Sequence, residues 1–514
     1  MDGSNMVQIN GRAVDFRRGS VTEPSGQVLT LRPQAAQVLK MLAERPGIPV
    51  TKDELMEAVW PGIAVTDDSL VQCIKEVRKA LGDDKHEIVV TLVKRGYVLE
   101  VSALRQPQSA KSNDAAPKAD PPAPERAQSI AVLPFTNLSA DAEQEFFVDG
   151  LAEDLITELS KVPELFVIAR YTSFAFKGRS GDVHRVAQEL GVRYILVGSV
   201  RRAAGRLRVN AQLIDARDGG ANLWAERFDR DLADIFAVQD EVVTCIVEAL
   251  VGKLAAAKRL TRKPPKNVEA YDLCIRGRFL WQRSMMEEGK ESRRLFEQAI
   301  AVDPDYAEAH AYLAWSHWMG WVNWFEPEDP HRGLALEIAR RAVALDSNEA
   351  FARSVLAYVL TYERQYEEST AQIEHALKID PNNADIRAMR TDLLVMDGQP
   401  LKAIESIAGA MRLNPRPPAW YYWLKGEAEY AARDYLGAIG TLRHEATYGT
   451  PSRSILAAAL AQFGRIDEAQ TEGRLFMADY PSFRIESFLD TQPFRNPADR
   501  EHFADGYRKA ALPE

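Results

Sequence analysis

The sequence predicts a multidomain chain with an α+β module first, an α/β domain in the middle and an all-α solenoid of helical repeats last. A polar, Pro/Ala-rich stretch without large apolar residues separates the first part from the rest. Strand and helix patterns then alternate, and beyond residue 268 the pattern is helical only and repeats. We therefore expect five segments, with the bounds 1–104, 105–128 (the linker), 129–257, 258–483 and 484–514 (a C-terminal capping segment).

The bulk composition is typical of a globular protein. The chain has 514 residues, of which 46% are hydrophobic and 27% charged, and this length suits several domains. No stretch approaches the roughly 20 apolar residues that span a bilayer, and the first residues lack the pattern of a signal peptide. The three cysteines are far apart and form no CxxC or Cys/His cluster. We expect a cytoplasmic protein without metal, cofactor or membrane contact.

Charge limits the kind of nucleic-acid contact that the chain can make. The net charge is −10, and residues 1–105 carry 14 basic and 14 acidic side chains. Non-specific attraction to DNA phosphates should then be weak. DNA binding would require a local basic face, a partner subunit or both, and we therefore expect a homodimer or a higher oligomer.

The N-terminal module combines short strands with three helices and a β-hairpin. The second helix begins at Thr51, where the sequence TKDE is a capping box, and the third helix ends at Gly82. The hairpin turns at Lys94-Arg95-Gly96. The expected strands and helices are Val7–Ile9, Ala13–Phe16, Leu29–Leu31, Pro33–Glu44, a helix from Thr51 to about Trp60, and Asp68–Leu81.

The third helix carries the functional signal of this module. One side is an apolar stripe that faces the core, formed by Leu70, Ile74, Val77 and Leu81. The opposite side is polar and presents Ser69, Gln72, Lys75, Glu76 and Lys79. Amide and ammonium groups match the base edges in the major groove of DNA. Arg78 lies to one side, where a phosphate contact is natural, and Lys94 and Arg95 place two cations at the hairpin tip.

Three motifs of residues 7–101 carry a resemblance to a known family: LMEAVWPG (55–62), SLVQCIKEVRKALGD (69–83) and VTLVKRGYVLEV (90–101). They resemble the winged helix-turn-helix of OmpR/PhoB-type regulators, and most closely its CadC/ToxR-like branch. The resemblance implies that the third helix enters the major groove, that Trp60 and Thr91 contact the DNA backbone and that Arg95 approaches the minor groove. Glu76 and Cys73 depart from the family pattern, and either could weaken base recognition. A phosphorelay receiver domain and the transmembrane helix of that branch are absent.

The middle domain shows no catalytic motif. Residues 130–160, 194–200 and 207–231 resemble a TolB-like/FlgO-like domain, and 207–214 and 223–228 alternate like an antiparallel pair of strands. One interpretation of Asp149, Glu153 and Asp154 is a carboxylate site. The favoured interpretation is an acidic first helical turn that complements the helix dipole. Because no P-loop, GxSxG or HExxH motif occurs, we expect no enzyme.

The C-terminal region repeats helical pairs. Asp-Pro or Asn-Pro steps recur at residues 303, 380 and 414, and a small residue precedes each step or its equivalent, at Ala299, Ala342, Ala376 and Ala410. The pattern resembles six tetratricopeptide repeats, at 273–306, 307–349, 350–383, 384–417, 418–450 and 451–483. An insertion in the second repeat carries tryptophans that form either a partner-binding patch or packing between repeats: Trp315, Trp318, Trp321 and Trp324.

These features favour a one-component bacterial transcription regulator. In this hypothesis the winged helix binds double-stranded promoter DNA, and the middle domain and repeats sense a ligand or dock a protein or peptide in the repeat groove. The alternative is a protein-interaction scaffold whose winged helix no longer binds DNA. The salt dependence of duplex binding separates the two hypotheses, because only a DNA-binding domain should lose affinity steeply as salt rises.

Overall fold

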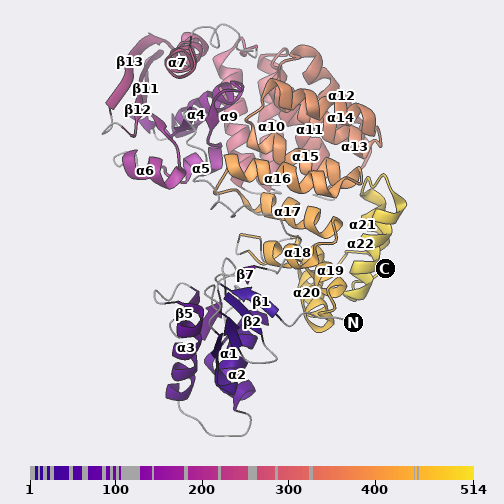
Figure 1. Ribbon diagram of the computed structural model, residues 1–514. Coiled ribbons are helices and arrows are strands. Elements are labelled where there is room, and N and C mark those ends of the chain that lie inside the picture. The colour runs from indigo at the N-terminus through magenta and orange to yellow at the C-terminus, as the bar shows by residue number, and fades with distance from the viewer. Residues whose placement is uncertain are drawn as a thin grey trace, which may run out of the picture. The chain divides into compact units, whose positions relative to one another are not determined.

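The computed structural model divides the chain into two compact units, Met1–Ala119 and Asp120–Glu514, which we describe separately (Figure 1). Among the described residues, no helix is both long and apolar enough to cross a membrane. The structure describes residues 6–9, 12–15, 20–22, 28–44, 50–60, 67–83, 88–92, 96–99, 104–105, 128–139, 141, 144–178, 183–217, 221–252, 263–283, 287–322, 328–444, 446–447 and 451–514.

The first unit contains an antiparallel sheet and three helices, as expected for a winged helix. The sheet order is β4-β3-β2-β1-β7, and β3 and β7 are short strands that the sequence analysis does not predict. The strands are β1 (Met6–Ile9), β2 (Arg12–Asp15), β3 (Ser20–Thr22), β4 (Val28–Thr30) and β7 (Leu104–Arg105). The helices are α1 (Pro33–Glu44), α2 (Lys52–Val59) and α3 (Asp67–Leu81).

Local sequence signals set the ends of these helices. The hydroxyl of Thr51 accepts a hydrogen bond from the Glu54 amide, and the Glu54 carboxylate accepts one from the Thr51 amide, which completes the predicted capping box. Gly82 follows α3 with a φ of 67°, a conformation that glycine adopts without strain. The predicted hairpin forms from β5 (Val89–Leu92) and β6 (Gly96–Leu99).

The middle part of the second unit is a mixed sheet with helices on both faces. Its order is β10-β8-β11-β12-β13, with β9 beside β11; β10, β8, β9 and β11 are parallel, whereas β11, β12 and β13 are antiparallel. The strands are β8 (Ser129–Val132), β9 (Thr136–Asn137), β10 (Phe166–Val167), β11 (Tyr194–Ala203), β12 (Arg206–Asp215) and β13 (Ala221–Asp231). The helices are α4 (Glu145–Ser160), α5 (Arg170–Phe174), α6 (Val183–Leu190) and α7 (Ile235–Leu250), with a 3₁₀ turn, η3, at Leu232–Asp234.

Two apolar cores flank this sheet. Ile130 and Val132 pack with α4 and α7 on one face, and Ala131 and Leu133 pack with α6 on the other. This alternation is what a strand with both faces covered requires. The predicted antiparallel pair is confirmed, because β12 pairs with β13. The last helix of the domain, α7, ends at Leu250.

Helical hairpins follow in the order that the repeats predict, and α21 and α22 end the chain. The four small residues at positions 299, 342, 376 and 410 are fully buried, which lets paired helices approach closely. The pairs are α9 (Val268–Arg283) with α10 (Glu287–Val302), α11 (Ala307–Val322) with α12 (Glu328–Leu345), α13 (Ala350–Tyr362) with α14 (Tyr366–Ile379), α15 (Ala384–Met396) with α16 (Pro400–Leu413), α17 (Ala419–Ala431) with α18 (Tyr435–Leu442), and α19 (Arg453–Gln462) with α20 (Ile466–Asp479). The final helices are α21 (Ile485–Thr491) and α22 (Pro497–Lys509).

The middle domain and the repeats share core residues. Tyr271 and Ile275 of α9 belong to the core of the middle domain, and Phe166 and Ala169 pack into a cluster of α15, α16 and α17. At Gly150 of α4, a Cβ atom would lie only 2.5 Å from the Ile275 side chain, so the two helices pack at the closest distance that glycine permits. The two parts therefore form one compact unit.

Candidate nucleic-acid interface

Helix α3 is amphipathic in the way that its sequence predicts. Its apolar stripe of Leu70, Ile74, Val77 and Leu81 is buried in the core of the first unit. On the other side, Gln72, Lys75 and Lys79 are exposed and Ser69 is half-buried. The structure thus brings one amide and two ammonium groups together on a single face of a rigid helix. Such a face can donate hydrogen bonds to base edges or phosphates.

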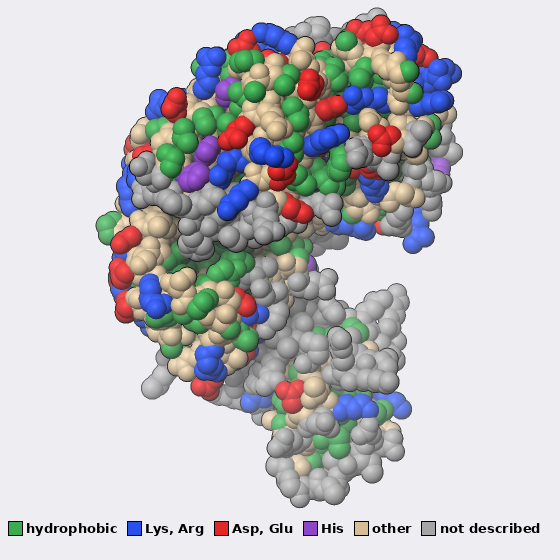
Figure 2. Space-filling view, turned by 180° about the vertical axis from the view of Figure 1, so that it is seen from behind, with side chains coloured by type: hydrophobic (Ala, Val, Ile, Leu, Met, Phe, Trp, Pro, Cys, Tyr) green, Lys and Arg blue, Asp and Glu red, His purple; other side chains and the backbone are tan. Residues whose placement is uncertain are grey.

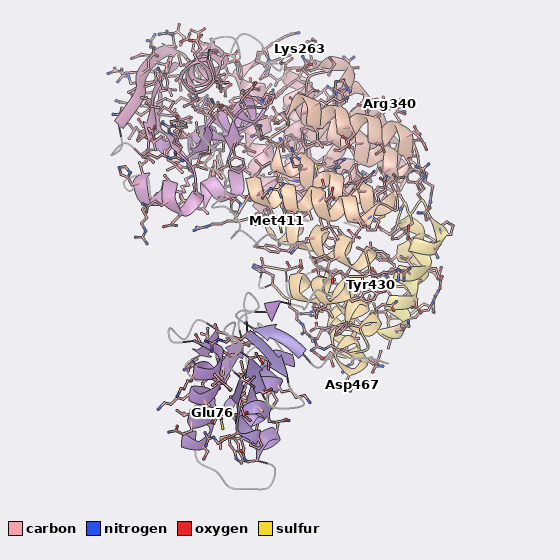
Figure 3. All side chains as sticks on the ribbon, viewed as in Figure 1. Glu76, Lys263, Arg340, Met411, Tyr430 and Asp467 are labelled. Atoms are coloured by element: carbon pink, nitrogen blue, oxygen red, sulfur yellow. The ribbon has the colours of Figure 1, made fainter. Side chains whose placement is uncertain are left out.

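Glu76, which Figure 3 labels, lies on the same helix but is bound within the domain. Its carboxylate accepts a hydrogen bond of 2.7 Å from the Arg32 backbone amide, just before α1, and pairs with the Arg32 guanidinium. These bonds raise the pKa of Arg32. The acidic residue that departs from the family pattern therefore joins α3 to the start of α1.

Arg78 is also held within the domain, unlike the phosphate contact that we expected. Its side chain is only 11% exposed and lies 3.8 Å from the buried carboxylate of Asp83. The guanidinium donates to the Val89 carbonyl at 2.9 Å and to the Thr91 hydroxyl at 2.9 Å. Arg78 therefore ties α3 to β5, the first strand of the hairpin, through its Nε and Nη2 donors.

Cys73 lies in the core of the first unit and not on the polar face. Burial raises the pKa of its thiol. Its side chain is therefore directed toward the interior and makes no part of the exposed face of α3. An uncommon residue on a helix can reflect packing alone.

The remaining predicted contacts lie around α3 or outside the described residues. Thr91 is exposed on β5, and Trp60 is partly buried where α2 ends. Lys94 and Arg95 lie outside the described residues. Sequence reasoning missed Arg12 of β2, which donates a hydrogen bond to the Ala80 carbonyl in the last turn of α3. No motif marks such a capping cation, because it comes from a distant strand.

The tryptophans of the second repeat pack against the next repeat. Trp315 and Trp318 stack with their ring centroids 4.6 Å apart, and Trp318 meets Tyr358 and Tyr362 of α13 edge-on at 5.2 Å. Trp318 is only 5% exposed, and Trp321 contacts Tyr362 as well. Trp324 lies outside the described residues. For the three described rings, the geometry is that of packing between repeats.

The acidic residues of α4 are bound by cations from other elements. Lys177 lies 2.7 Å from Asp149, and Arg278 of α9 lies 2.9 Å from Glu153 and 3.1 Å from Asp154. Only Glu145 stands in the first turn of α4, so the expected explanation by the helix dipole is wrong. Glu153 and Asp154 therefore join the middle domain to the first repeat, whereas Asp149 is paired within the middle domain.

Different family models match the two units of the chain. Residues 26–99 match the model of "Transcriptional regulatory protein, C terminal". Residues 126–245 match the model of "HilA/YgeH-like transcriptional regulator, second domain". The first range contains β4, the three helices and the β5–β6 hairpin, and the second contains all six strands of the mixed sheet.

Similar proteins include regulators and one named as a cyclase. "Putative adenylate cyclase 3" of Rhizobium meliloti is 47% identical over 253 residues, which are 48% of this chain and 42% of that relative. "Transcriptional regulator HilA" of Salmonella typhimurium is 22% identical over 401 residues, 76% of this chain and 68% of the relative. "Transcriptional activator CadC" of Escherichia coli is 32% identical over 83 residues, 16% of each chain. The chain thus spans less than half the length of the first of these relatives.

Fold and comparisons together define a class by its architecture: a winged helix that matches a family of transcriptional regulatory proteins, followed by a mixed-sheet domain and helical repeats. Within that class, the likeness to HilA extends over three quarters of the chain, whereas the likeness to CadC covers 83 residues.

Proposed function

We propose that the chain is a one-component transcription regulator that binds double-stranded promoter DNA through α3 and the adjacent hairpin. The observation that carries this proposal is the exposed row of Gln72, Lys75 and Lys79 on a helix whose opposite side is fixed in the core. A rigid helix can hold such donors at fixed positions against the major groove, where each good base contact contributes about 1–3 kcal/mol of discrimination.

The electrostatic footprint of one module is small. Since Glu76 and Arg78 are engaged within the domain, Lys75 and Lys79 are the basic side chains that α3 has for phosphates or bases. Residues 1–105 as a whole have no net charge. Two or more modules on neighbouring half-sites would combine such weak contacts into useful affinity. This supports a homodimer or a larger assembly on DNA.

The second unit supports a sensing or docking role. On the face shown in Figure 2, basic and acidic side chains are interspersed among the described residues of this unit, so these residues form no extended surface of one sign for DNA. Its middle domain contacts several repeats, so a ligand or a peptide bound between them would contact both parts. We propose that this unit receives the signal and that the winged helix acts on it.

Two other functions compete with this proposal. A scaffold would use the same winged helix for protein contacts and would bind no duplex. An enzyme is suggested only by the name of the Rhizobium meliloti relative, 58% of whose length lies outside the match. The acidic residues of α4 are paired with Lys177 and Arg278, which favours a structural role for them. We expect no cyclic AMP when the purified chain is incubated with ATP and divalent metal ions.

Selection of bound sequences from random duplex DNA tests the proposal. The full chain should enrich a short motif, and a Lys75→Ala, Lys79→Ala double variant should lose that enrichment. A Lys290→Ala variant, which removes an exposed lysine from α10, should enrich the same motif as the native chain. Failure of the native chain to enrich any sequence would favour the scaffold.

A further inference from the structure

A groove of about 480 Å³ lies where the middle domain meets the repeats. One wall is the segment before β10 together with Gln128, and the other wall is formed by α15, α16 and the loop before α15. Its volume is within the range of sites for small organic ligands. The lining residues are Gln128, Pro163, Glu164, Leu165, Phe166, Asn382, Arg387, Gly409, Arg412 and Leu413.

Two arginines converge inside this groove. A Cβ atom placed on Gly409 would lie 3.6 Å from Nη2 of Arg412 and 3.7 Å from Nη1 of Arg387. Both guanidinium groups therefore approach the same point above α16, and the glycine leaves that point open. Figure 3 labels Met411, which directly precedes Arg412 on α16 and so locates this part of the helix.

This arginine pair has an N–H donor without a hydrogen-bond partner among the described residues. Nη2 of Arg387 donates to the Pro381 carbonyl, whereas its buried Nε has no hydrogen-bond partner in the described structure. A buried donor without a partner is costly. Burial and the nearby charges of Arg390 and Arg412 lower the pKa of Arg387. Like charges held together in this way would be stabilised by an anion placed between them.

We propose that this groove binds a small organic anion whose phosphate or carboxylate lies between Arg387 and Arg412. Guanidinium groups bind both kinds of oxyanion through paired N–H donors. The apolar body of the ligand would lie along Leu165, Phe166 and Leu413. Glu164 is exposed at the rim and is the one carboxylate among the lining residues, so the lining carries a net positive charge.

The position of the groove explains how a bound ligand would regulate the protein. The ligand would contact both the β10 segment and two repeat helices, so its binding would stabilise one arrangement of that junction. This inference rests on the proposed sensing role of the second unit, and it names the class of signal. It does not depend on how α3 recognises DNA.

Titration calorimetry and thermal unfolding of the full chain test this site. The probes are inorganic phosphate, glycerol 3-phosphate and citrate, with sodium chloride at matched ionic strength as the reference. Phosphate and carboxylate sources are thereby distinguished. We expect at least one probe to bind saturably and to raise the unfolding temperature more than chloride does.

Two variants and a control make the test specific. Arg412→Ala removes an exposed side chain without touching the core and should weaken binding about 10-fold or more. Gly409→Gln should fill the groove, since its Cβ makes only ordinary contacts, and should abolish binding. Arg474→Ala, which removes an exposed arginine from α20, should bind as the native chain does. Binding that is unchanged in Arg412→Ala, or no saturable binding of any probe, would overturn the inference; promoter binding by the same preparation would then leave the proposed function standing.

Discussion

At the scale of single residues, the charged side chains on and beside the polar face of α3 are of two kinds. Glu76 and Arg78 pair with groups elsewhere in the domain, whereas Lys75 and Lys79 extend into solvent. The helical period in the sequence identifies the face correctly. It does not identify the pairing, because the partners of Glu76 and Arg78 stand 44 and 11 residues away along the chain.

This division predicts opposite effects for neighbouring substitutions. Arg78→Ala should destabilise the contact between α3 and the wing by about 1–3 kcal/mol, because the Val89 carbonyl and the buried Asp83 lose their cationic partner. Hydrogen exchange measured by mass spectrometry should show faster exchange in residues 88–99. Lys75→Ala is the matched control and should leave that exchange unchanged; equal protection in both variants would refute the structural role of Arg78.

At the scale of elements, the helix ends that mark the repeats also bind other segments of the second unit. Asp303 and Asp346 accept hydrogen bonds from the Lys266 and Lys263 amides, at 2.6 and 2.7 Å. Asn414 accepts a bond of 2.7 Å from the Thr172 hydroxyl. Asp303 and Asp346 therefore also hold the segment before α9, and Asn414 also holds the middle domain.

Asp380 occupies the equivalent position in its repeat and predicts a pH dependence. Burial raises its pKa to about 6, so the folded state keeps a proton that the unfolded chain releases near pH 4. Its contribution to stability is therefore largest below about pH 4 and is lost as the pH rises through about 6.

An Asp380→Asn variant should remove this dependence, and asparagine is compatible with the site because Asn414 fills the same place in the next repeat. Thermal unfolding of the native chain and the variant should differ by about 1–3 kcal/mol more at pH 7.5 than at pH 4.5, with the variant more stable. Asp467→Asn, at an exposed carboxylate on α20 (Figure 3), should show no such difference. Parallel pH profiles for the native chain and Asp380→Asn would contradict the raised pKa.

Most elements are predictable from local signals. The capping box at Thr51 and the glycine at 82 give the ends of α2 and α3 correctly. Strands β3 and β7 are missed because they have only three and two residues, which is too short for an alternating apolar pattern to show. Helix α6 is also missed, although Val183, Val186 and Leu190 give it an apolar stripe that periodicity would have detected.

At the scale of the whole molecule, a buried ionic network joins the middle domain to the repeats. Arg278 is 3% exposed and contacts Glu153, Asp154 and Glu308, which come from α4 and α11. Tyr271 adds a hydrogen bond of 2.6 Å to Asp154. The sequence shows these residues but not their meeting, since Arg278 and Asp154 are 124 residues apart.

Removing the positive charge of Arg278 should strongly destabilise the second unit. We expect Arg278→Ala to lower the stability of the second unit by about 3–5 kcal/mol, because it leaves buried carboxylates without a counter-charge. Arg206→Ala, which breaks an exposed pair with Asp229 on the sheet, should cost less than about 1 kcal/mol. Urea unfolding followed by tryptophan fluorescence measures both, and equal midpoints for the two variants would rule out a structural role for the network.

The central claim is that α3 binds DNA through its exposed lysines. The most direct test is the dissociation constant of the full chain for its selected duplex, measured by fluorescence anisotropy over a range of salt concentrations. Affinity should fall steeply with salt, and Lys75→Ala with Lys79→Ala should weaken it at least about 10-fold and reduce the salt slope by about two per module, while Lys290→Ala changes neither. Affinity and slope that are identical in the native chain and the double variant would contradict the account.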